Sequence, residues 1–180
     1  MRQLKKKITA PEVIYQLLDA APVGRLATVG PDGWPMVKPL NFARDGLRLY
    51  FHCAQEGEKL DHIGRDPRVC FEVDLAIAYV RGTAEDPCRA NYLYRSAIAL
   101  GRAHVVAVEA ERRLALDLLM RKYQPQGGYG DYLPEKLALT AVVRIDIEAL
   151  SGKEDLGKGD FRAQGLALLE SGAPLPAVFG

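Results

Sequence analysis

Alternating apolar and polar positions over residues 33–69 predict a strand, a tight turn, a second strand and a helix. Residues 36–42 mix apolar and polar side chains at strand spacing. Residues 47–53 alternate and are rich in aromatic rings, which is typical of a half-buried strand. Gly46 lies between them and favours a turn, because glycine tolerates positive φ. Residues 56–65 have the apolar spacing of a helix that ends before the next proline. The segment is therefore a predicted hairpin that leads directly into a helix.

The same patterns predict the other elements. Further strands are expected over residues 23–30, 68–74, 76–80, 91–108 and 139–147, and further helices over residues 10–21, 109–122 and 161–169. Gly101 interrupts a long apolar segment, and a strand bent at a glycine explains this segment better than a helix does. About six strands joined by hairpins favour a mainly β fold: a small closed or half-open antiparallel β-barrel with peripheral helices.

Composition limits the protein to ordinary globular classes. At 180 residues the chain fits one domain, and its net charge of +1 argues against a nucleic-acid binder that depends on bulk electrostatics. Its three cysteines are odd in number and lack CxxC spacing, which indicates a reduced protein. No apolar run approaches the ~18 residues that span a membrane, and no apolar stretch of a signal peptide follows the basic segment 1–7. We therefore expect a cytoplasmic protein that binds neither nucleic acid nor membrane.

The start of the predicted helix, at residues 55–59, is the first candidate site. Free backbone amides and the Lys59 ammonium together favour an anion there, although most exposed lysines are simply solvated. His52 shares one face of its strand with Tyr50, and a histidine in such a place is more often a packing residue than a catalytic one. Position alone therefore makes Lys59 a candidate phosphate ligand.

Other common catalytic motifs are missing from the sequence. The histidines show no HxxxH or HxH pairing and no cysteine lies at ligand spacing, so we expect no metal site. The sequence contains no GxSxG, GxGxxG or GxxxxGK[ST] motif, which disfavours a serine hydrolase, a Rossmann fold and a P-loop NTPase. Arg95 and Ser96 place a cation beside a hydroxyl, two donors that suit phosphate or carbonyl oxygens.

Four segments of the sequence occur in the order of a known family. They are VGRLATVGPDGWPMVKPLNF, LYFHCAQEGEKLDHIGRDPRVCFEV, YRSAIALGRAHVV and VVRIDIEALSGK, and together they span residues 23–153. In these segments the chain resembles the pyridoxamine-phosphate-oxidase-like flavin-binding split barrels, most closely their nitroimidazole-reductase-related branch. The resemblance implies an FMN-binding split-barrel domain over residues 1–153 and a homodimer with two FMN sites at the subunit interface. The C-terminal tail, residues 154–180, is expected to form a short helix that either packs on the dimer partner or is loosely held.

The same resemblance implies which residues bind FMN. These residues are Met36, Val37, Lys38, Pro39, Leu40, Asn41, Phe51, His52, Cys53, Lys59, Arg95 and Ser96. Those on the two hairpin strands would line the isoalloxazine ring, largely through the backbone, and Lys59 would hold the phosphate. Arg95 and Ser96 would supply polar contacts, with either subunit as their source, and Lys153 is a weaker candidate. Glu58 stands where members of the family often carry a second basic residue, so fewer cations are expected around the phosphate.

The function that the resemblance implies is FMN-dependent reduction of a small organic acceptor of nitroaromatic or quinone type, with NAD(P)H as a candidate electron donor. His52 is the expected catalytic side chain, chosen by position alone. Two alternatives stay open: a flavin carrier or sensor without turnover, and the same barrel with haem or a deazaflavin coenzyme. The substrate-phosphate residues of true pyridoxamine-phosphate oxidases are not recognisable, so vitamin B6 oxidation is not expected.

Overall fold

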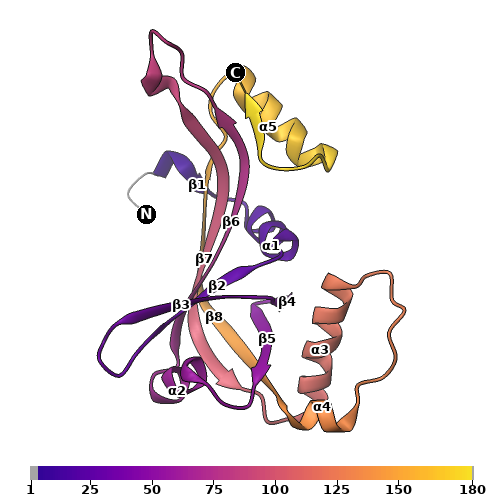
Figure 1. Cartoon of the computed structure of the whole chain (residues 1–180). Coiled ribbons are helices and arrows are strands. Elements are labelled where there is room, and N and C mark those ends of the chain that lie inside the picture. Colours follow the sequence, from indigo (N-terminus) through magenta and orange to yellow (C-terminus); the bar gives the residue numbers. More distant parts are fainter. Residues whose placement is uncertain (1–3, 180) are drawn as a thin grey trace. The chain divides into compact units, whose positions relative to one another are not determined.

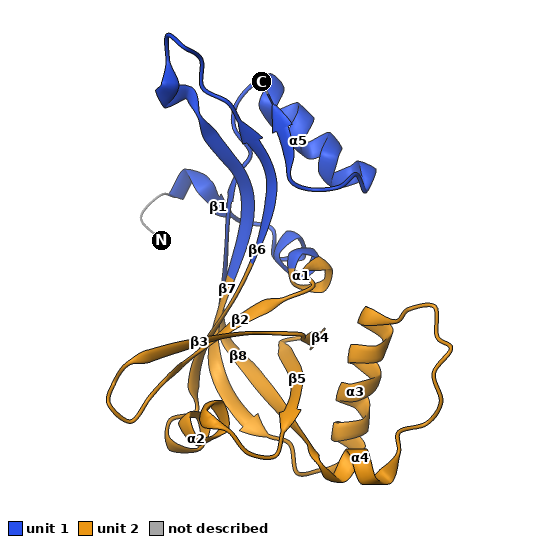
Figure 2. Ribbon diagram, viewed as in Figure 1, with its two compact units in different colours: residues 1–17, 74–97, 151–180 blue, residues 18–73, 98–150 orange. Residues whose placement is uncertain are grey.

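The computed structural model describes residues 4–179, and the first three residues of the basic segment 1–7 lie outside the described part. The chain divides into two compact units (Figure 2): residues 1–17, 74–97 and 151–180 make up unit 1, and residues 18–73 and 98–150 make up unit 2. Three long strands contribute to both units (Figure 1): β6 (Arg68–Val80), β7 (Asn91–Val105) and β8 (Thr140–Asp155). The expected domain boundary at residue 153 stays a prediction.

Unit 2 is an antiparallel β-barrel whose strands follow the order β3-β2-β6-β7-β8-β5-β4. Its other strands are β2 (Gly24–Val29), β3 (Pro35–Leu40), β4 (Ala43–Asp45) and β5 (Arg48–Ala54). Only two residues separate β3 from β4, so the chain itself joins the two ends of the sheet. With β3 and β4 counted as one bent strand, the barrel has six strands, and the expected mainly β barrel with peripheral helices is confirmed.

Successive side chains along each strand point alternately into the barrel and toward its outer surface. Phe51 and Phe71 are fully buried. On the opposite face of β5, Tyr50 is equally buried, because α3 (Glu109–Tyr123) packs over it through Leu119 and neighbouring apolar residues. The other helices of unit 2 are α2 (Glu58–Arg65) and α4 (Pro134–Ala138). Both faces of β5 are therefore apolar in its middle.

Side chains from α3 hold the bend between β3 and β4. Phe42 occupies the bend, is fully buried, and packs edge-to-face on Phe71 with ring centroids 4.8 Å apart. The Tyr123 hydroxyl accepts a hydrogen bond from the Phe42 amide at 3.0 Å and donates one to the Pro22 carbonyl at 2.9 Å. The Lys122 ammonium lies 3.7 Å from the centroid of the Phe42 ring. These contacts satisfy the backbone where the strand changes its pairing partner.

Unit 1 is built on the remaining ends of the three long strands. Its strand order is β9-β6-β7-β8-β1, in which β9 (Ala177–Phe179) pairs parallel to β6 and β1 (Lys7–Ile8) pairs antiparallel to β8. Helix α5 (Asp160–Ser171) covers a core that includes Ile77, Leu93 and Leu156. The short helices η1 (Leu4–Lys6) and η2 (Pro87–Arg89) and the first part of α1 (Pro11–Ala20) complete the unit.

The structure corrects several predicted element boundaries. Residues 68–74 and 76–80, expected as two strands, form the single strand β6, in which the alternation of buried positions slips by one between Ile77 and Ala78. β8 continues to Asp155, past the predicted end at 147, and is followed by α5 and β9. The predicted strand through Gly101 is confirmed as part of β7, and a β-carbon at Gly101 would lie 2.1 Å from the Asp146 carbonyl oxygen, so only glycine fits. The bend at this glycine stays a prediction.

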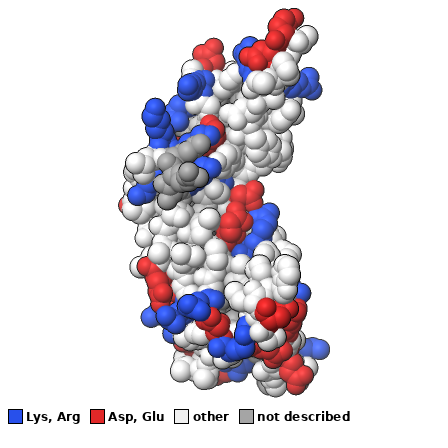
Figure 3. Space-filling model, turned by 90° about the vertical axis from the view of Figure 1, so that its left-hand side faces the viewer, with Lys and Arg blue, Asp and Glu red and all other residues white. Residues whose placement is uncertain are grey.

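Charges of both signs are mixed over the surface. On the face in Figure 3, basic and acidic side chains lie beside one another in several places, which agrees with the net charge of +1. Within residues 4–179, no helix is long and apolar enough to cross a membrane. Cys53, Cys70 and Cys88 are free thiols.

Tyr123→Phe is expected to destabilise the protein by about 1–3 kcal/mol, because the amide of the buried Phe42 loses its acceptor. Each kcal/mol lowers the midpoint of thermal unfolding by roughly 2–4 °C for a chain of this length. Tyr129→Phe is the matched control, since Tyr129 is 41% exposed in a loop. Equal unfolding midpoints for the two variants in differential scanning calorimetry would contradict a structural role for the Tyr123 hydroxyl.

Candidate functional site

The junction between β5 and α2 places a lysine at a helix start. Gly57 precedes α2 with a φ of 140°, which favours glycine, and no side chain caps the helix. The amides of Leu60 and Asp61 donate to the Gly57 carbonyl, whereas those of Glu58 and Lys59 have no acceptor within the helix. Lys59 is half-buried, and no carboxylate of residues 4–179 lies within ion-pair distance of it. This helix start therefore favours an anion.

Glu58, the acid beside Lys59, is neutralised by a lysine from β3. The Lys38 ammonium lies 3.4 Å from the Glu58 carboxylate. The pair is largely exposed, so it contributes little to stability, but it gives Glu58 a counter-ion of its own. It also brings β3 to the start of α2, so that the predicted cofactor-binding residues 36–41 and Lys59 belong to one region of unit 2.

Two open strand edges border this region. β3 is a terminal strand of the sheet order, so its residues pair only with β2. β4 pairs with β5 only as far as Tyr50, so residues 51–53 pair with β8 alone. β3 and β5 diverge from the bend that joins β3 to β4 (Figure 1), which leaves backbone N–H and C=O groups of both strands for a ligand. The predicted residues 36–41 and 51–53 therefore lie on or next to two strand edges without a second pairing strand, and these two edges are called the split in the barrel.

The side chains of residues 51–53 face different surroundings. Phe51 is fully buried in the barrel, so only its backbone is open to a ligand. Cys53 is half-buried, and burial raises the pKa of its thiol although the charge of Lys59 opposes this shift. Cys53 therefore stays a neutral thiol at neutral pH. The effect of Lys59 on Cys53 also shows that the end of β5 and the first turn of α2 are close neighbours.

His52 faces the helix side of β5 and lines a pocket of about 220 Å³. The other walls are mainly apolar and come from α3, α4 and their connection: Leu116, Leu119, Met120, Tyr132, Leu133 and Leu137. Lys136 and Thr140 add polar groups. Because a cavity of roughly 150 Å³ holds benzene, this pocket has room for one small aromatic molecule.

Arg95 and Ser96 belong to unit 1 and lie on β7. The Arg95 guanidinium donates to Glu154 at 3.0 Å and is largely buried. Ser96 is half-buried, and Lys153 lies 5.5 Å from the centroid of the Tyr94 ring. Arg95 thus has a carboxylate partner inside its own unit, and contact of Arg95 and Ser96 with a flavin stays a prediction.

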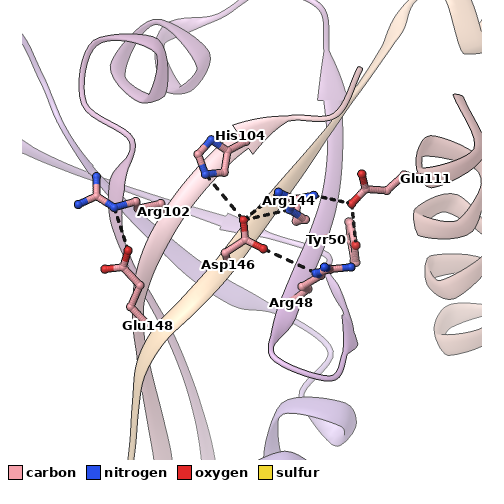
Figure 4. A network of polar contacts seen from close by, with 8 residues as sticks. All are labelled: Arg48, Tyr50, Arg102, His104, Glu111, Arg144, Asp146 and Glu148. Carbon is pink, nitrogen blue, oxygen red and sulfur yellow. Dashed lines mark hydrogen bonds and ion pairs between the residues drawn. The ribbon is translucent and has the colours of Figure 1, made fainter. Parts of the chain in front are cut away.

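A cluster of polar side chains ties β5 and β8 to α3 (Figure 4). Glu111 Oε1 accepts hydrogen bonds from the Tyr50 hydroxyl and from the Arg144 guanidinium, both at 2.9 Å. Arg144 also pairs with Asp146 at 2.9 Å, and Arg48 lies 3.7 Å from the same carboxylate. The first turn of α3 is therefore anchored to the barrel by charge as well as by apolar packing.

The charges of this cluster shift its own titration. The Arg144 guanidinium holds the pKa of Glu111 below its usual range, and the Tyr50 hydroxyl adds to this effect. Burial raises the pKa of Tyr50, and the Glu111 carboxylate raises it further. Glu111 is therefore ionised and Tyr50 neutral at pH 7. No group of three or more His, Cys, Asp or Glu among residues 4–179 could hold a metal ion.

A sequence model of the family described as pyridoxamine 5'-phosphate oxidase matches residues 10–154. The chain belongs to the pyridoxamine 5'-phosphate oxidase family. The resemblance noted from the sequence motifs is thus confirmed, and the match covers both strands of the split, α2 and the Glu111 cluster. A comparison with curated proteins gives no match.

Solved structures share the fold of this family member. A candidate 5-nitroimidazole antibiotic resistance protein from Bacteroides thetaiotaomicron is 24% identical, with a TM-score of 0.73 over 82% of this chain and 86% of its own. The flavocytochrome Anf3 from Azotobacter vinelandii is 23% identical, with a TM-score of 0.75 over 93% of this chain and 77% of its own. The FAD and haem binding protein from Mycobacterium smegmatis is 25% identical, with a TM-score of 0.75 over 90% of this chain and 79% of its own.

Sequence reasoning did not identify the partners of the site residues. Lys38 was expected beside the flavin ring, and its pairing with Glu58 has no local sequence pattern. The walls of the His52 pocket come from α3 and α4, and no helix was predicted at α4. The acidic first turn of α3 was visible in the sequence, but nothing in it indicated that Glu111 bonds to Tyr50 and Arg144.

Glu111→Gln is expected to lower the stability at pH 7 by about 1–2 kcal/mol, because Arg144 loses a charged partner. The pKa of Glu111 is depressed in the folded state. Its stabilisation is therefore complete above the ordinary glutamate pKa of ~4.3 and disappears as the pH falls through the lower folded value. Thermal unfolding between pH 7 and pH 3 should show the wild-type advantage shrinking with falling pH.

Glu109→Gln is the matched control for this measurement. Glu109 lies in the same first turn of α3, but its ion pairs with Arg112 and Arg113 are exposed and contribute little. A gap between wild type and Glu111→Gln that does not change with pH, or that the control reproduces, would rule out the charge of Glu111 as the cause.

Proposed function

We propose that this protein binds FMN and uses it to reduce a small organic acceptor of nitroaromatic or quinone type. The observation that carries the proposal is the split in the barrel, where the open edges of β3 and β5 and the start of α2 with Lys59 belong to one region. Membership of the pyridoxamine 5'-phosphate oxidase family supports a flavin as the ligand, as does the fold shared with the FAD and haem binding protein of Mycobacterium smegmatis.

The described residues fit both ends of FMN. The phosphate suits the Lys59 ammonium and the unpaired amides of the first turn of α2. The polar rim of the isoalloxazine ring suits two strand edges that offer both donors and acceptors. The side chains of Trp34 and Val37, 74% and 57% exposed, offer apolar cover for a planar ring. Bound FMN supplies hydride and electron transfer, and the protein orients the ring and shields it from water.

A homodimer with FMN at its interface belongs to the same proposal. Unit 2 exposes apolar side chains on the β2–β3 hairpin and on β7: Val29, Trp34, Val37, Ile98 and Leu100. Exposed apolar surface of this kind is typical of subunit interfaces. Arg95 and Ser96 of the partner subunit would then add polar contacts to the flavin. The free thiols fit a reducing compartment, so a cytoplasmic location is part of the proposal.

His52 gives the acceptor a polar partner in a pocket whose walls are mainly apolar. An imidazole N–H at this place can donate a hydrogen bond to a nitro or quinone oxygen, and a protonated ring can deliver a proton to it. The pocket volume of about 220 Å³ limits the acceptor to a small ring. NAD(P)H is the proposed electron donor.

Lys59→Ala is expected to weaken FMN binding by about 10–100-fold, because a hydrogen bond to a charged group is worth about 1.5–3 kcal/mol. Riboflavin has the same ring and no phosphate, so its affinity should not change. Titration of each flavin, followed by quenching of its fluorescence, gives both affinities with the same protein.

The control for Lys59→Ala is Lys7→Ala, which removes an exposed lysine from unit 1. It should leave both affinities unchanged. If Lys59→Ala weakens riboflavin as much as FMN, or weakens neither, Lys59 does not hold the phosphate.

His52→Ala is expected to slow reoxidation of the reduced flavin by a nitroaromatic or quinone by about 10²-fold or more. FMN binding and flavin reduction by NAD(P)H should be unchanged, because the acceptor pocket is not used in that half-reaction. Anaerobic stopped-flow measurement separates the two half-reactions. His104→Ala, which removes a half-exposed histidine of β7, is the control; equal reoxidation rates in the two variants would remove His52 from the mechanism.

A haem-binding barrel is the second candidate function. It is favoured by the fold shared with the flavocytochrome of Azotobacter vinelandii and the FAD and haem binding protein of Mycobacterium smegmatis. The absorption spectrum of the purified protein separates the candidates, since a Soret band indicates haem and flavin bands indicate FMN. A bound flavin that neither NADH nor NADPH bleaches without oxygen would instead indicate a carrier or sensor.

A further inference from the structure

A cavity with a volume of about 710 Å³ lies within unit 1. It is formed by η1, the unit 1 ends of β6, β7 and β8, η2 and the start of α5. Val80, Leu93 and Leu156 form its buried apolar floor. Ligand pockets for organic molecules usually enclose about 300–1,000 Å³, so this cavity has the size of a small-molecule site.

Two carboxylates line the cavity, and both are neutralised by neighbouring cations. Asp155 pairs with Lys6 at 2.5 Å. Glu154 accepts a hydrogen bond from Arg95 at 3.0 Å and lies 3.9 Å from Arg162. Lys6 lowers the pKa of Asp155 against the opposing effect of its burial. The acidic groups of the cavity therefore attract no further cation.

Three more cations line the same cavity without an ion-pair partner among residues 4–179: Lys5, Arg89 and Lys158. All three are exposed. The Arg89 guanidinium carbon lies 5.6 Å from the centroid of the Phe161 ring, which is half-buried and stacks on Phe179. The cavity thus combines an apolar floor, an arginine–aromatic wall and two lysines with uncompensated charge.

We infer that this cavity binds a planar heteroaromatic phosphate of mononucleotide size. The two lysines hold the phosphate, and the base stacks on the wall of Arg89 and Phe161, since guanidinium and phenyl groups both stack on nucleobases. The Asn91 side chain lies in the same lining as Asp155 and offers a polar contact to the edge of the base. A simple inorganic anion would leave the apolar floor uncovered, and an uncharged base would leave the lysines unpaired.

The inference concerns residues of unit 1 and does not depend on the proposed flavin site. Isothermal titration calorimetry of the full chain without added FMN tests it, because free FMN is itself a planar heteroaromatic phosphate and would compete for the cavity. Lys59→Ala, which alters only the proposed flavin-phosphate site, should leave the affinity for AMP unchanged. AMP, adenosine and inorganic phosphate are the three probes. AMP should bind with a Kd below about 1 mM, and adenosine and phosphate should each bind at least about tenfold more weakly, since each makes only part of the contacts.

Two exposed lining residues serve as variants that leave the core intact. Lys158→Ala should weaken AMP by about tenfold and leave adenosine unchanged, whereas Arg89→Ala should weaken both. Lys7→Ala removes an equal charge from unit 1 outside the lining and should change neither. The inference is overturned if AMP gives no saturable heat, if AMP binds no better than adenosine or phosphate, or if Lys7→Ala weakens AMP as much as Lys158→Ala does.

Discussion

The constraint on which unit 2 depends is the bend at Asn41 and Phe42. One continuous stretch of chain, β3 followed by β4, forms the strands at both ends of the sheet. β3 pairs with β2, β4 pairs with β5, and only two residues separate β3 from β4. Regular pairing cannot continue through such a change, so the backbone at the bend needs other partners. The Tyr123 hydroxyl provides them, and the buried Phe42 ring fixes the position of the bend in the core. The open edges of β3 and β5 follow directly, because a strand that turns away from its neighbour leaves both unpaired. The candidate site is thus a consequence of how the barrel closes.

Helix α3 supports the barrel at both of its ends. Glu111 in its first turn bonds to Tyr50 and Arg144, and Tyr123 at its end holds the bend. Between these anchors the helix covers the outer face of β5 and forms one wall of the pocket that His52 lines. Loss of either anchor should therefore affect more than stability. A helix that is free to move at one end would change the walls around His52. Mutations at either anchor of α3 are therefore expected to alter the shape of the proposed acceptor pocket.

Local patterns in the sequence predicted those elements whose structure depends on neighbouring residues in the chain. The aromatic alternation of residues 47–53, the helical spacing of α2 and α3, and a strand that continues through Gly101 were all readable. The continuity of β6 was not readable, because its buried positions slip by one between Ile77 and Ala78 and break the period-two pattern. The Tyr123–Phe42 and Glu111–Tyr50 bonds join residues far apart in the chain. No single-sequence pattern specifies such a pair, since each residue type has many acceptable environments. Family resemblance supplied the candidate ligands of FMN, Lys38 among them, but not the pairing of Lys38 with Glu58.

In each candidate site, neighbouring cations neutralise the acidic residues, and this determines the charge of the site. Glu58 beside Lys59 would repel a phosphate, yet Lys38 lies 3.4 Å from it and cancels its charge locally. In unit 1 the same arrangement recurs, with Lys6 on Asp155 and two arginines on Glu154. In both places the sequence shows a carboxylate that would disfavour anion binding. In the folded protein a neighbouring cation neutralises this carboxylate. The net charge read from the sequence therefore underestimates how strongly these regions attract an anion. The lining cations that have no ion-pair partner among residues 4–179 are Lys59 in one unit and Lys5, Arg89 and Lys158 in the other, and their charge is what each proposed site would offer an anionic ligand.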